Sequence, residues 1–235
     1  MANEHISRKF DSELEGVRSR VLQMGGLVER QIGRALDALV NGDLVLADAV
    51  IRDDHLVNAL EVGIDDDCTH IIARRQPTAS DLRMVMAVVK TITDLERIGD
   101  EAQKIARMAK FIHQQDVRFT PPIADVRYAA NIALDMLRTA LDAFARLDVS
   151  GAAKVVKQDE EVDERFRAVL RQLVTFMMED PRTISSSIDM LFIAKAIERI
   201  GDHAKNMSEY VVYLVKGKDV RHTTLEEFER AATNG

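Results

Sequence analysis

The sequence ERIGD occurs twice in this chain, at residues 96–100 and again at residues 198–202. Around each copy, apolar residues recur at steps of three and four, the spacing of one face of an α-helix. In a helix interior the glycine costs about 1 kcal/mol relative to alanine, and two acids four residues apart repel each other by about 0.2 to 0.5 kcal/mol. Both choices weaken the helix, so their repetition indicates a purpose other than helix stability.

The chain consists of two similar halves. The sequence ALDA at residues 35–38 recurs at residues 140–143, and the same spacing of 105 relates Asp54 to Asp159. The two ERIGD segments lie 102 residues apart, and a longer turn around Pro77 in the first half accounts for the difference. A repeat of this length exceeds the unit of a solenoid and is typical of a duplicated domain.

The composition and the apolar periodicity both favour helices. Of 235 residues, 46% are hydrophobic, 5% are aromatic and four are prolines, which suits an all-α protein with a sizeable core. The periodicity predicts six helices, at about 8–41, 44–74, 79–114, 122–146, 149–179 and 183–216. Antiparallel helices joined by short turns form bundles, so we predict two tandem, pseudo-repeated three-helix bundles.

This fold divides the chain into four segments. We expect a first bundle at 1–115, a linker with the Pro121-Pro122 pair at 116–122, a second bundle at 123–217 and a polar C-terminal tail at 218–235. The tail is polar enough that we expect it to fray.

Charge and hydropathy limit the partners and the compartment. A net charge of −7 disfavours nonspecific binding to phosphate polymers, so we expect no nucleic-acid partner. The first twenty residues hold acids and no continuous apolar stretch, which excludes a secretory signal, and no later stretch approaches the roughly 18 apolar residues of a membrane span. Cys68 is the single cysteine, so no disulfide forms within the chain. We expect a cytoplasmic protein.

Oxygen-bearing side chains gather at corresponding places in the two halves. Carboxylates at i and i+4 on two adjacent helices can converge on one point, and a bound cation would turn their repulsion into attraction. Oxygen-only ligand sets suit Mg, Ca, Mn or iron, whereas Zn usually recruits His or Cys. The candidate ligands are Glu96, Asp100 and Asp54 in the first half and Glu198, Asp202, Asp159, Asp163 and Asn206 in the second.

The first half has fewer oxygen ligands at these places. Asn58 and Lys104 stand where the second half has Asp163 and Asn206, so the sequence predicts weaker metal binding in the first half.

Two alternatives stay open on the residues alone. In a helical scaffold whose acids bind no metal, Arg97 would pair with Asp100, and the glycine would let a neighbouring backbone approach at a helix crossing. A carboxylate-bridged di-metal enzyme would be expected to use Glu-x-x-His ligands. The sequence contains no such motif, which weighs against the enzyme.

Four segments carry a family resemblance. They are TDLERIGDEAQKIARMA, AIERIGDHAKNMSEYVVYLVKG, ARRQPTASDLR and MMEDPRTIS. With these segments the chain resembles, over nearly its whole length, the PhoU family of bacterial phosphate-transport accessory and regulatory proteins. The resemblance implies two three-helix bundles and no enzymatic activity.

The resemblance also implies a role and a cofactor. Members of the family are cytoplasmic negative regulators of the phosphate-starvation response that restrain phosphate uptake. They link the cytoplasmic side of the phosphate ABC transporter to a sensor histidine kinase, so they are peripheral to the membrane through partners, and a homodimer is expected. They carry divalent or trivalent metal, often iron, on Glu/Asp-xxx-Asp motifs, and Mn, Mg and Zn stay open as alternatives here. By position, the motif residues are Glu96, Asp100, Glu198 and Asp202.

Overall fold

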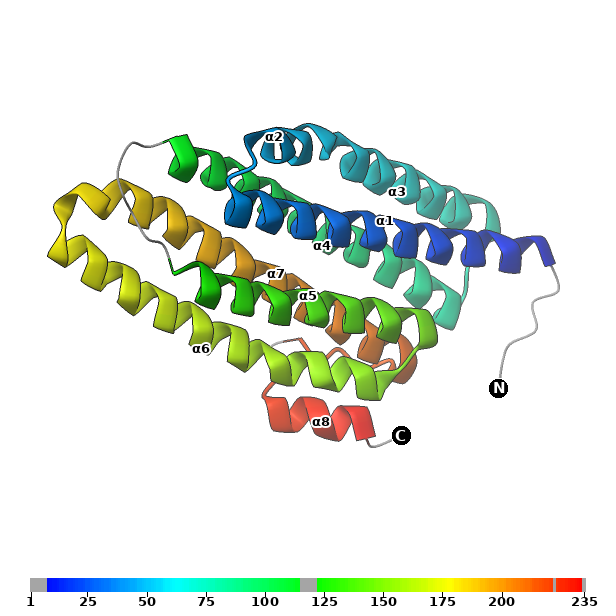
Figure 1. The fold of residues 1–235 in the computed structure, drawn as a ribbon. Coiled ribbons are helices and arrows are strands. Elements are labelled where there is room, and N and C mark those ends of the chain that lie inside the picture. Colours follow the sequence, from blue (N-terminus) through cyan, green and yellow to red (C-terminus); the bar gives the residue numbers. More distant parts are fainter. Residues whose placement is uncertain (1–7, 115–121, 222, 234–235) are drawn as a thin grey trace.

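The computed structural model describes residues 8–114, 122–221 and 223–233, and every regular element in these ranges is a helix (Figure 1). The all-α prediction is therefore confirmed. The elements are α1 (Arg8–Asn41), α2 (Leu44–Asp53), α3 (His55–Arg75), α4 (Ala79–Gln114), α5 (Ile123–Arg146), α6 (Val149–Glu179), the 3-10 turn η1 (Pro181–Thr183), α7 (Ile184–Lys216) and α8 (Leu225–Thr233).

Corresponding helices begin in the same way in both halves. Asp43 precedes α2, and its side chain accepts a hydrogen bond from the backbone N–H of Leu46 at 2.9 Å. Asp148 precedes α6 and accepts from the N–H of Ser150, also at 2.9 Å. An aspartate N-cap satisfies a backbone donor that the helix leaves unpaired and contributes about 1 kcal/mol. The repeat seen in the sequence is thus also present in the helix caps.

One predicted helix is divided. Residues 44–74 form α2 and α3, which meet at Asp54, so the prediction of one continuous helix there is wrong. The backbone at Asp54 stays right-handed, with φ −57° and ψ −33°, and its carbonyl accepts from the N–H of Val57 at 2.9 Å, a three-residue step. The ring Nδ1 of His55 lies 2.7 Å from the carbonyl of Arg52. The junction between α2 and α3, with this three-residue hydrogen bond, therefore lies at Asp54, one of the candidate metal ligands.

The C-terminal segment is more ordered than its polarity suggests. The expectation that it frays is wrong for the residues of α8, which lies along α6 in Figure 1. Phe228 is only 2% exposed and Ala231 packs on the core, so one face of α8 is apolar although its composition is polar. Of the predicted linker at 116–122, only Pro122 lies within the described residues.

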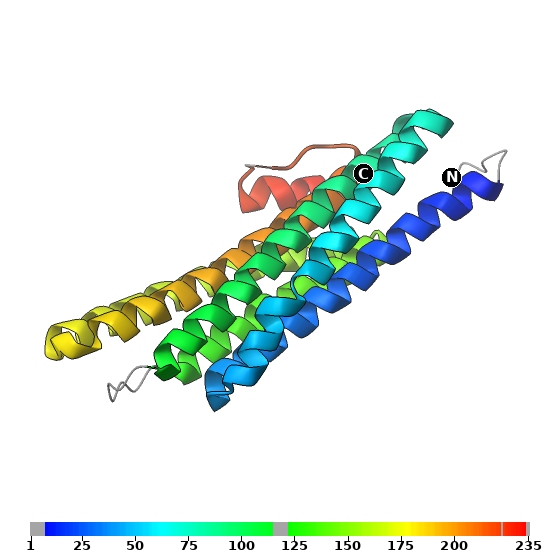
Figure 2. The same ribbon diagram turned by 90° about the horizontal axis from the view of Figure 1, so that it is seen from above.

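The helices form two bundles that lie side by side as an elongated body (Figures 1 and 2). The first bundle consists of α1 to α4 and the second of α5 to α7, with α4 and α7 packed against each other along their lengths. One continuous apolar core runs through both, with Leu95, Ile98, Ile197 and Ile200 all at most 1% exposed. Burying such a side chain contributes about 1.5 to 3 kcal/mol. The two ERIGD segments therefore lie on helices that meet at the centre of the molecule.

Charged side chains join the two bundles. The buried carboxylate of Glu101 on α4 lies 2.9 Å from Arg199 on α7 and 2.7 Å from Lys104. Asp94, also buried, lies 2.7 Å from the ring Nδ1 of His203 and accepts from the Asn206 amide at 3.1 Å. These contacts pair α4 with α7 in opposite directions. In the described ranges no helix has the length and apolar character needed to cross a bilayer.

Candidate functional site

In the first bundle, Asp54, Glu96 and Asp100 lie close enough that the charge of Asp100 affects the pKa values of the other two. Asp54 is 6% exposed, whereas the side chains of Glu96 and Asp100 are 18% and 42% exposed. Burial raises the pKa of Asp54, and the charge of Asp100 raises it further. Burial likewise raises the pKa of Glu96, and Asp100 again adds to the effect. The three predicted ligands thus form one acidic cluster.

A residue that the sequence did not single out completes the inner side of this cluster. Gln31 on α1 is 1% exposed, and within the described residues neither its amide oxygen nor its amide nitrogen has a hydrogen-bond partner. Oδ1 of Asp54 is buried and unpartnered as well. Leaving a buried polar atom unsatisfied costs about 1 to 3 kcal/mol. The Gln31 side chain nevertheless interacts with Asp54 and lowers the pKa of that carboxyl, so the two groups face each other at a geometry too poor for a full hydrogen bond.

The glycine of the first ERIGD lies beside these atoms. A Cβ added to Gly99 would lie 3.4 Å from Oε1 of Gln31 and 3.5 Å from Oδ1 of Asp54. Its closest neighbours are side chains at ordinary contact distance, so close backbone packing does not explain the glycine. In the second bundle a Cβ on Gly201 would instead meet Sδ of Met136 at 3.6 Å. The glycine thus leaves room beside unpartnered oxygens in the first bundle only.

The acids of the second bundle are paired with basic side chains. Lys195 contacts both carboxylate oxygens of Glu198 at 2.5 Å. Asp159, which is 8% exposed, accepts from Lys205 at 2.6 Å. The remaining acid, Asp163, accepts from Arg167 at 3.2 Å.

Asp202 differs from these acids because no ion pair to it is found in the described part of the chain. Burial, followed by the charges of Glu198 and Asp159, raises its pKa to about 6.

Two of the four residues by which the sequence ranked the sites are engaged elsewhere. Asn206 donates to Asp94 on α4, and Lys104 pairs with Glu101. Asn58 is exposed. The prediction of weaker metal binding in the first half thus loses the support of Asn206 and Lys104, while the difference between Asn58 and Asp163 stands.

Basic side chains pair with acids in both bundles: Arg97 lies 3.5 Å from Glu96 and 3.7 Å from Asp100, as the metal-free scaffold predicts. The sites differ in the closeness of these pairs, since the lysine contacts in the second bundle are 2.5 and 2.6 Å.

The donor sets can be compared with what a hard cation requires. Nowhere in the described ranges do three His, Cys, Asp or Glu side chains stand together as a metal site. In the first bundle the buried oxygens of Asp54 and Gln31 border the space beside Gly99, and a cation there has to compete with Arg97, at 3.5 Å from Glu96 and 3.7 Å from Asp100. In the second bundle a cation has to displace lysines. The first cluster fits a hard metal ion better.

The raised pKa of Asp202 predicts a pH-dependent stability. Its usual value is 3.8, so the folded protein keeps a proton that the unfolded chain has already lost. This contribution to stability is fully present below the unfolded pKa and is lost as pH rises through about 6. In chelator, Asp202→Asn should therefore raise the free energy of unfolding by about 1 to 2 kcal/mol at alkaline pH, after allowance for partial exposure, and little at acid pH. Urea titrations at both pH values test this, with Asp142→Asn, at an exposed position of α5, as control. An equal gain from Asp202→Asn at both pH values would contradict the prediction.

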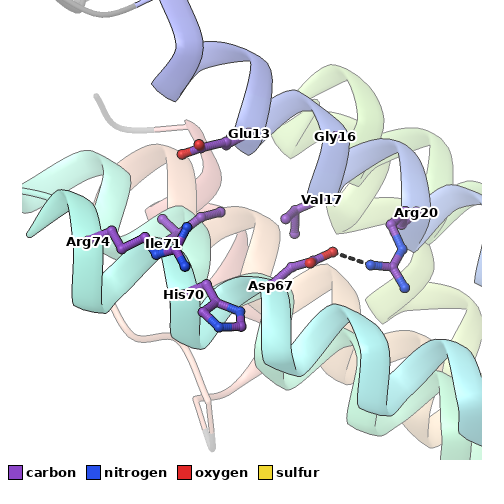
Figure 3. Close-up of a pocket in the computed structure, with 8 residues that line it drawn as sticks. All are labelled: Glu13, Gly16, Val17, Arg20, Asp67, His70, Ile71 and Arg74. Carbon is purple, nitrogen blue, oxygen red and sulfur yellow. Dashed lines mark hydrogen bonds and ion pairs between the residues drawn. The ribbon is translucent and has the colours of Figure 1, made fainter.

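A cleft between α1 and α3 lies apart from both clusters (Figure 3). It has a volume of about 610 Å³, and Val17 and Ile71 contribute apolar surface. Its charged side chains neutralise one another, since Arg20 pairs with Asp67 and Glu13 pairs with Arg75 beside the cleft. The cleft shares no residue with the acidic clusters, so it is not part of the candidate metal sites.

The architecture defines a class of protein: all-helical, made of two similar bundles, α1 to α4 and α5 to α7, each with an acidic cluster next to the same glycine-containing segment. The family model of the PhoU domain matches this chain twice, at residues 21–109 and 126–211. The chain belongs to the PhoU family. It is accordingly a non-enzymatic regulatory accessory protein, which excludes the di-metal enzyme considered from the sequence.

Relatives match over nearly the whole chain. The phosphate-specific transport system accessory protein PhoU of Serratia marcescens is 49% identical over 97% of this chain and 93% of its own. The protein of the same name from Escherichia coli (strain K12) is 47% identical over 97% and 94%. The crystal structure of PhoU from Pseudomonas aeruginosa superposes with a TM-score of 0.85 at 46% identity, covering 89% of this chain and 100% of that one.

Proposed function

We propose that this chain restrains phosphate uptake and acts as a negative regulator of the phosphate-starvation response. In this role it is a cytoplasmic homodimer that connects the cytoplasmic side of the phosphate ABC transporter to a sensor histidine kinase. It reaches the membrane through these partners. The observation that carries the proposal is the near full-length match to accessory proteins named for the phosphate-specific transport system, with identities of 47% and 49%.

The adaptor role is tested by pull-down of the transporter and of the kinase with the full-length chain. Two strongly exposed apolar residues probe the two bundles separately: Val62, 68% exposed, and Met178, 80% exposed. We expect the unaltered chain to retain both partners, and Val62→Glu or Met178→Glu to release one of them. Failure of the unaltered chain to retain either partner would count against an adaptor.

We further propose that each acidic cluster binds a divalent or trivalent metal ion, and that the first cluster binds it more tightly. Asp54, Glu96 and Asp100 would hold the ion there, with the Gln31 amide oxygen facing it. The charge of the ion would offset the repulsion between the acids, as a cation does at any carboxylate site. The support is the pair of unpartnered oxygens in the first bundle and the lysine-paired acids in the second.

Elemental analysis of the chain purified without chelator tests this proposal. Asp54→Asn/Glu96→Gln should remove the more tightly held metal, and Asp159→Asn/Glu198→Gln should remove the more weakly held metal. Mn²⁺ titrations of the two variants then rank the sites, since each reports the cluster left intact. Metal content indifferent to both double substitutions would favour a scaffold whose acids bind no metal. Tighter binding at the second cluster would reverse the ranking.

A further inference from the structure

The face formed by α4 and α7 has two corresponding ends. The helices run in opposite directions, and the spacing of 102 that relates the ERIGD segments also relates the residues around them. Thus Met108 and Phe111 near the end of α4 correspond to Tyr210 and Tyr213 near the end of α7. Lys90 on α4 likewise corresponds to Phe192 on α7. A rotation that exchanges the helices therefore exchanges the two ends of this face.

The chain itself covers one of these ends. After α7 the irregular segment Gly217–Arg221 follows, and its Val220 belongs to the apolar core and is only 3% exposed. Gly217 lies next to Arg83 on α4, since an added Cβ would be 3.8 Å from the guanidinium carbon. Beneath the segment, the ammonium of Lys90 lies 5.5 Å from the ring centre of Tyr210. An irregular segment with one buried apolar side chain thus seals this end.

The acidic residue of this segment lies near a basic residue of the face. Asp219 has its pKa lowered to about 2, chiefly by hydrogen bonds to Arg221 and further by the charge of Lys90. The ion pair of Asp219 thus lies within the segment itself, with Arg221 at 2.5 Å.

The other end of the face is an open groove. It has a volume of about 700 Å³ and lies between the end of α4 and the first half of α7, at the left of Figure 1. Phe111 and Phe192 are 51% and 50% exposed on its wall. Two half-exposed aromatic rings facing one hollow are the kind of apolar surface that marks a binding site.

The groove is rich in positive charge. Arg97, Lys104, Arg107 and Arg199 line it, against three acids, and one of those acids, Glu101, is buried under Lys104 and Arg199. The guanidinium of Arg107 donates to the amide oxygen of Gln103 at 2.5 Å, and its charge also lowers the pKa of Asp54. Lys104 and Arg199 pair with Glu101, and Arg97 lies 3.7 Å from Asp100. Arg107 is therefore the cation that the groove presents beside its two phenylalanine rings.

We propose that this groove binds an extended, acidic segment of a partner protein, with an apolar side chain of that segment seated between Phe111 and Phe192. The proposal rests on the adaptor role only in requiring a protein partner. The covered end supplies the pattern: there Val220, an apolar residue of the segment after α7, is only 3% exposed. A flat anionic membrane would leave the hollow unfilled, which favours a peptide.

Fluorescence anisotropy with the full-length chain and labelled synthetic peptides tests this. The probe is a short peptide of Asp and Glu around a central Leu; one comparison peptide has Lys for every acid and another has Ser for the Leu. We expect saturable binding of the probe alone, weakening with salt. Arg107→Glu and Phe192→Ser should each weaken binding about tenfold or more. Arg171→Glu, an equal charge change at an exposed residue of α6, should not.

Three outcomes would overturn the proposal. They are no saturable binding of the acidic peptide, equal weakening by Arg171→Glu, and binding to anionic phospholipid vesicles through Arg107 without peptide binding. Circular dichroism of each variant separates lost binding from lost folding. The pull-downs described above are independent: an adaptor that retains both partners while failing to bind the peptide would disprove the groove alone.

Discussion

Replacing both Lys104 and Arg199 with methionine is expected to lower the free energy of unfolding by about 3 to 5 kcal/mol at neutral pH. The two residues neutralise Glu101, whose side chain is only 4% exposed at the contact between α4 and α7. Removing both leaves a buried carboxylate without a compensating charge. Urea denaturation of the double variant against the unaltered chain measures the loss.

A third substitution tests the cause. Adding Glu101→Gln to the double variant should restore most of the stability, because a neutral amide replaces the uncompensated charge. Arg182→Met is the control: its ion pair with Asp180 is exposed, so its loss should cost less than about 1 kcal/mol. If the triple variant is no more stable than the double variant, the uncompensated charge of Glu101 is not the cause of the lost stability.

The single substitutions Gln31→Met and Met136→Gln should change the free energy of unfolding in opposite directions. The two residues correspond at a spacing of 105, and both lie next to the glycine of ERIGD at no more than 1% exposure. Met136→Gln buries an amide in an apolar place and should cost about 2 to 4 kcal/mol. Gln31→Met removes an unsatisfied amide and should stabilise the metal-free protein by about 1 to 3 kcal/mol. Denaturation in chelator checks both.

The same substitutions bear on the metal proposal. Gln31→Met should reduce the metal retained by the first cluster while stabilising the metal-free chain, a combination that a purely structural glutamine would not produce. Loss of stability on Gln31→Met would show that the amide has a partner in solution and would remove one support for the site. The Met136→Gln result stands as a control for the size of the buried-amide cost.

Much of the fold could be predicted because it is local or repeated. Helical periodicity identifies the long helices to within about two residues, and the matching aspartates 43 and 148 cap their helices as a duplication requires. The junction at Asp54 could not be predicted, since the corresponding Asp159 lies within one unbroken helix, α6. The order of α8 depends on Phe228 finding a buried place, which is a tertiary contact.

The acids of the candidate site could be predicted from the sequence, but the side chains around them could not. Spacing alone identifies Glu96, Asp100, Glu198 and Asp202 as pairs, but it does not show which acids a lysine neutralises. Lys205 reaches Asp159 from another helix, a contact that has no sequence signature. Gln31 had a signal that went unused: a polar residue on an apolar face, where the other half has Met136.

The contact between Glu101 and Arg199 also means that the two halves differ in their ability to pair with a second copy of themselves. By the repeat, Arg199 corresponds to Arg97 and Glu101 corresponds to His203. Two copies of the first half, arranged as the halves are here, would form the Glu101–Arg97 pair twice. Two copies of the second half would set His203 against Arg199 twice, with no carboxylate at either place. The first half thus retains the means to pair with itself, and the second depends on having the first as its neighbour.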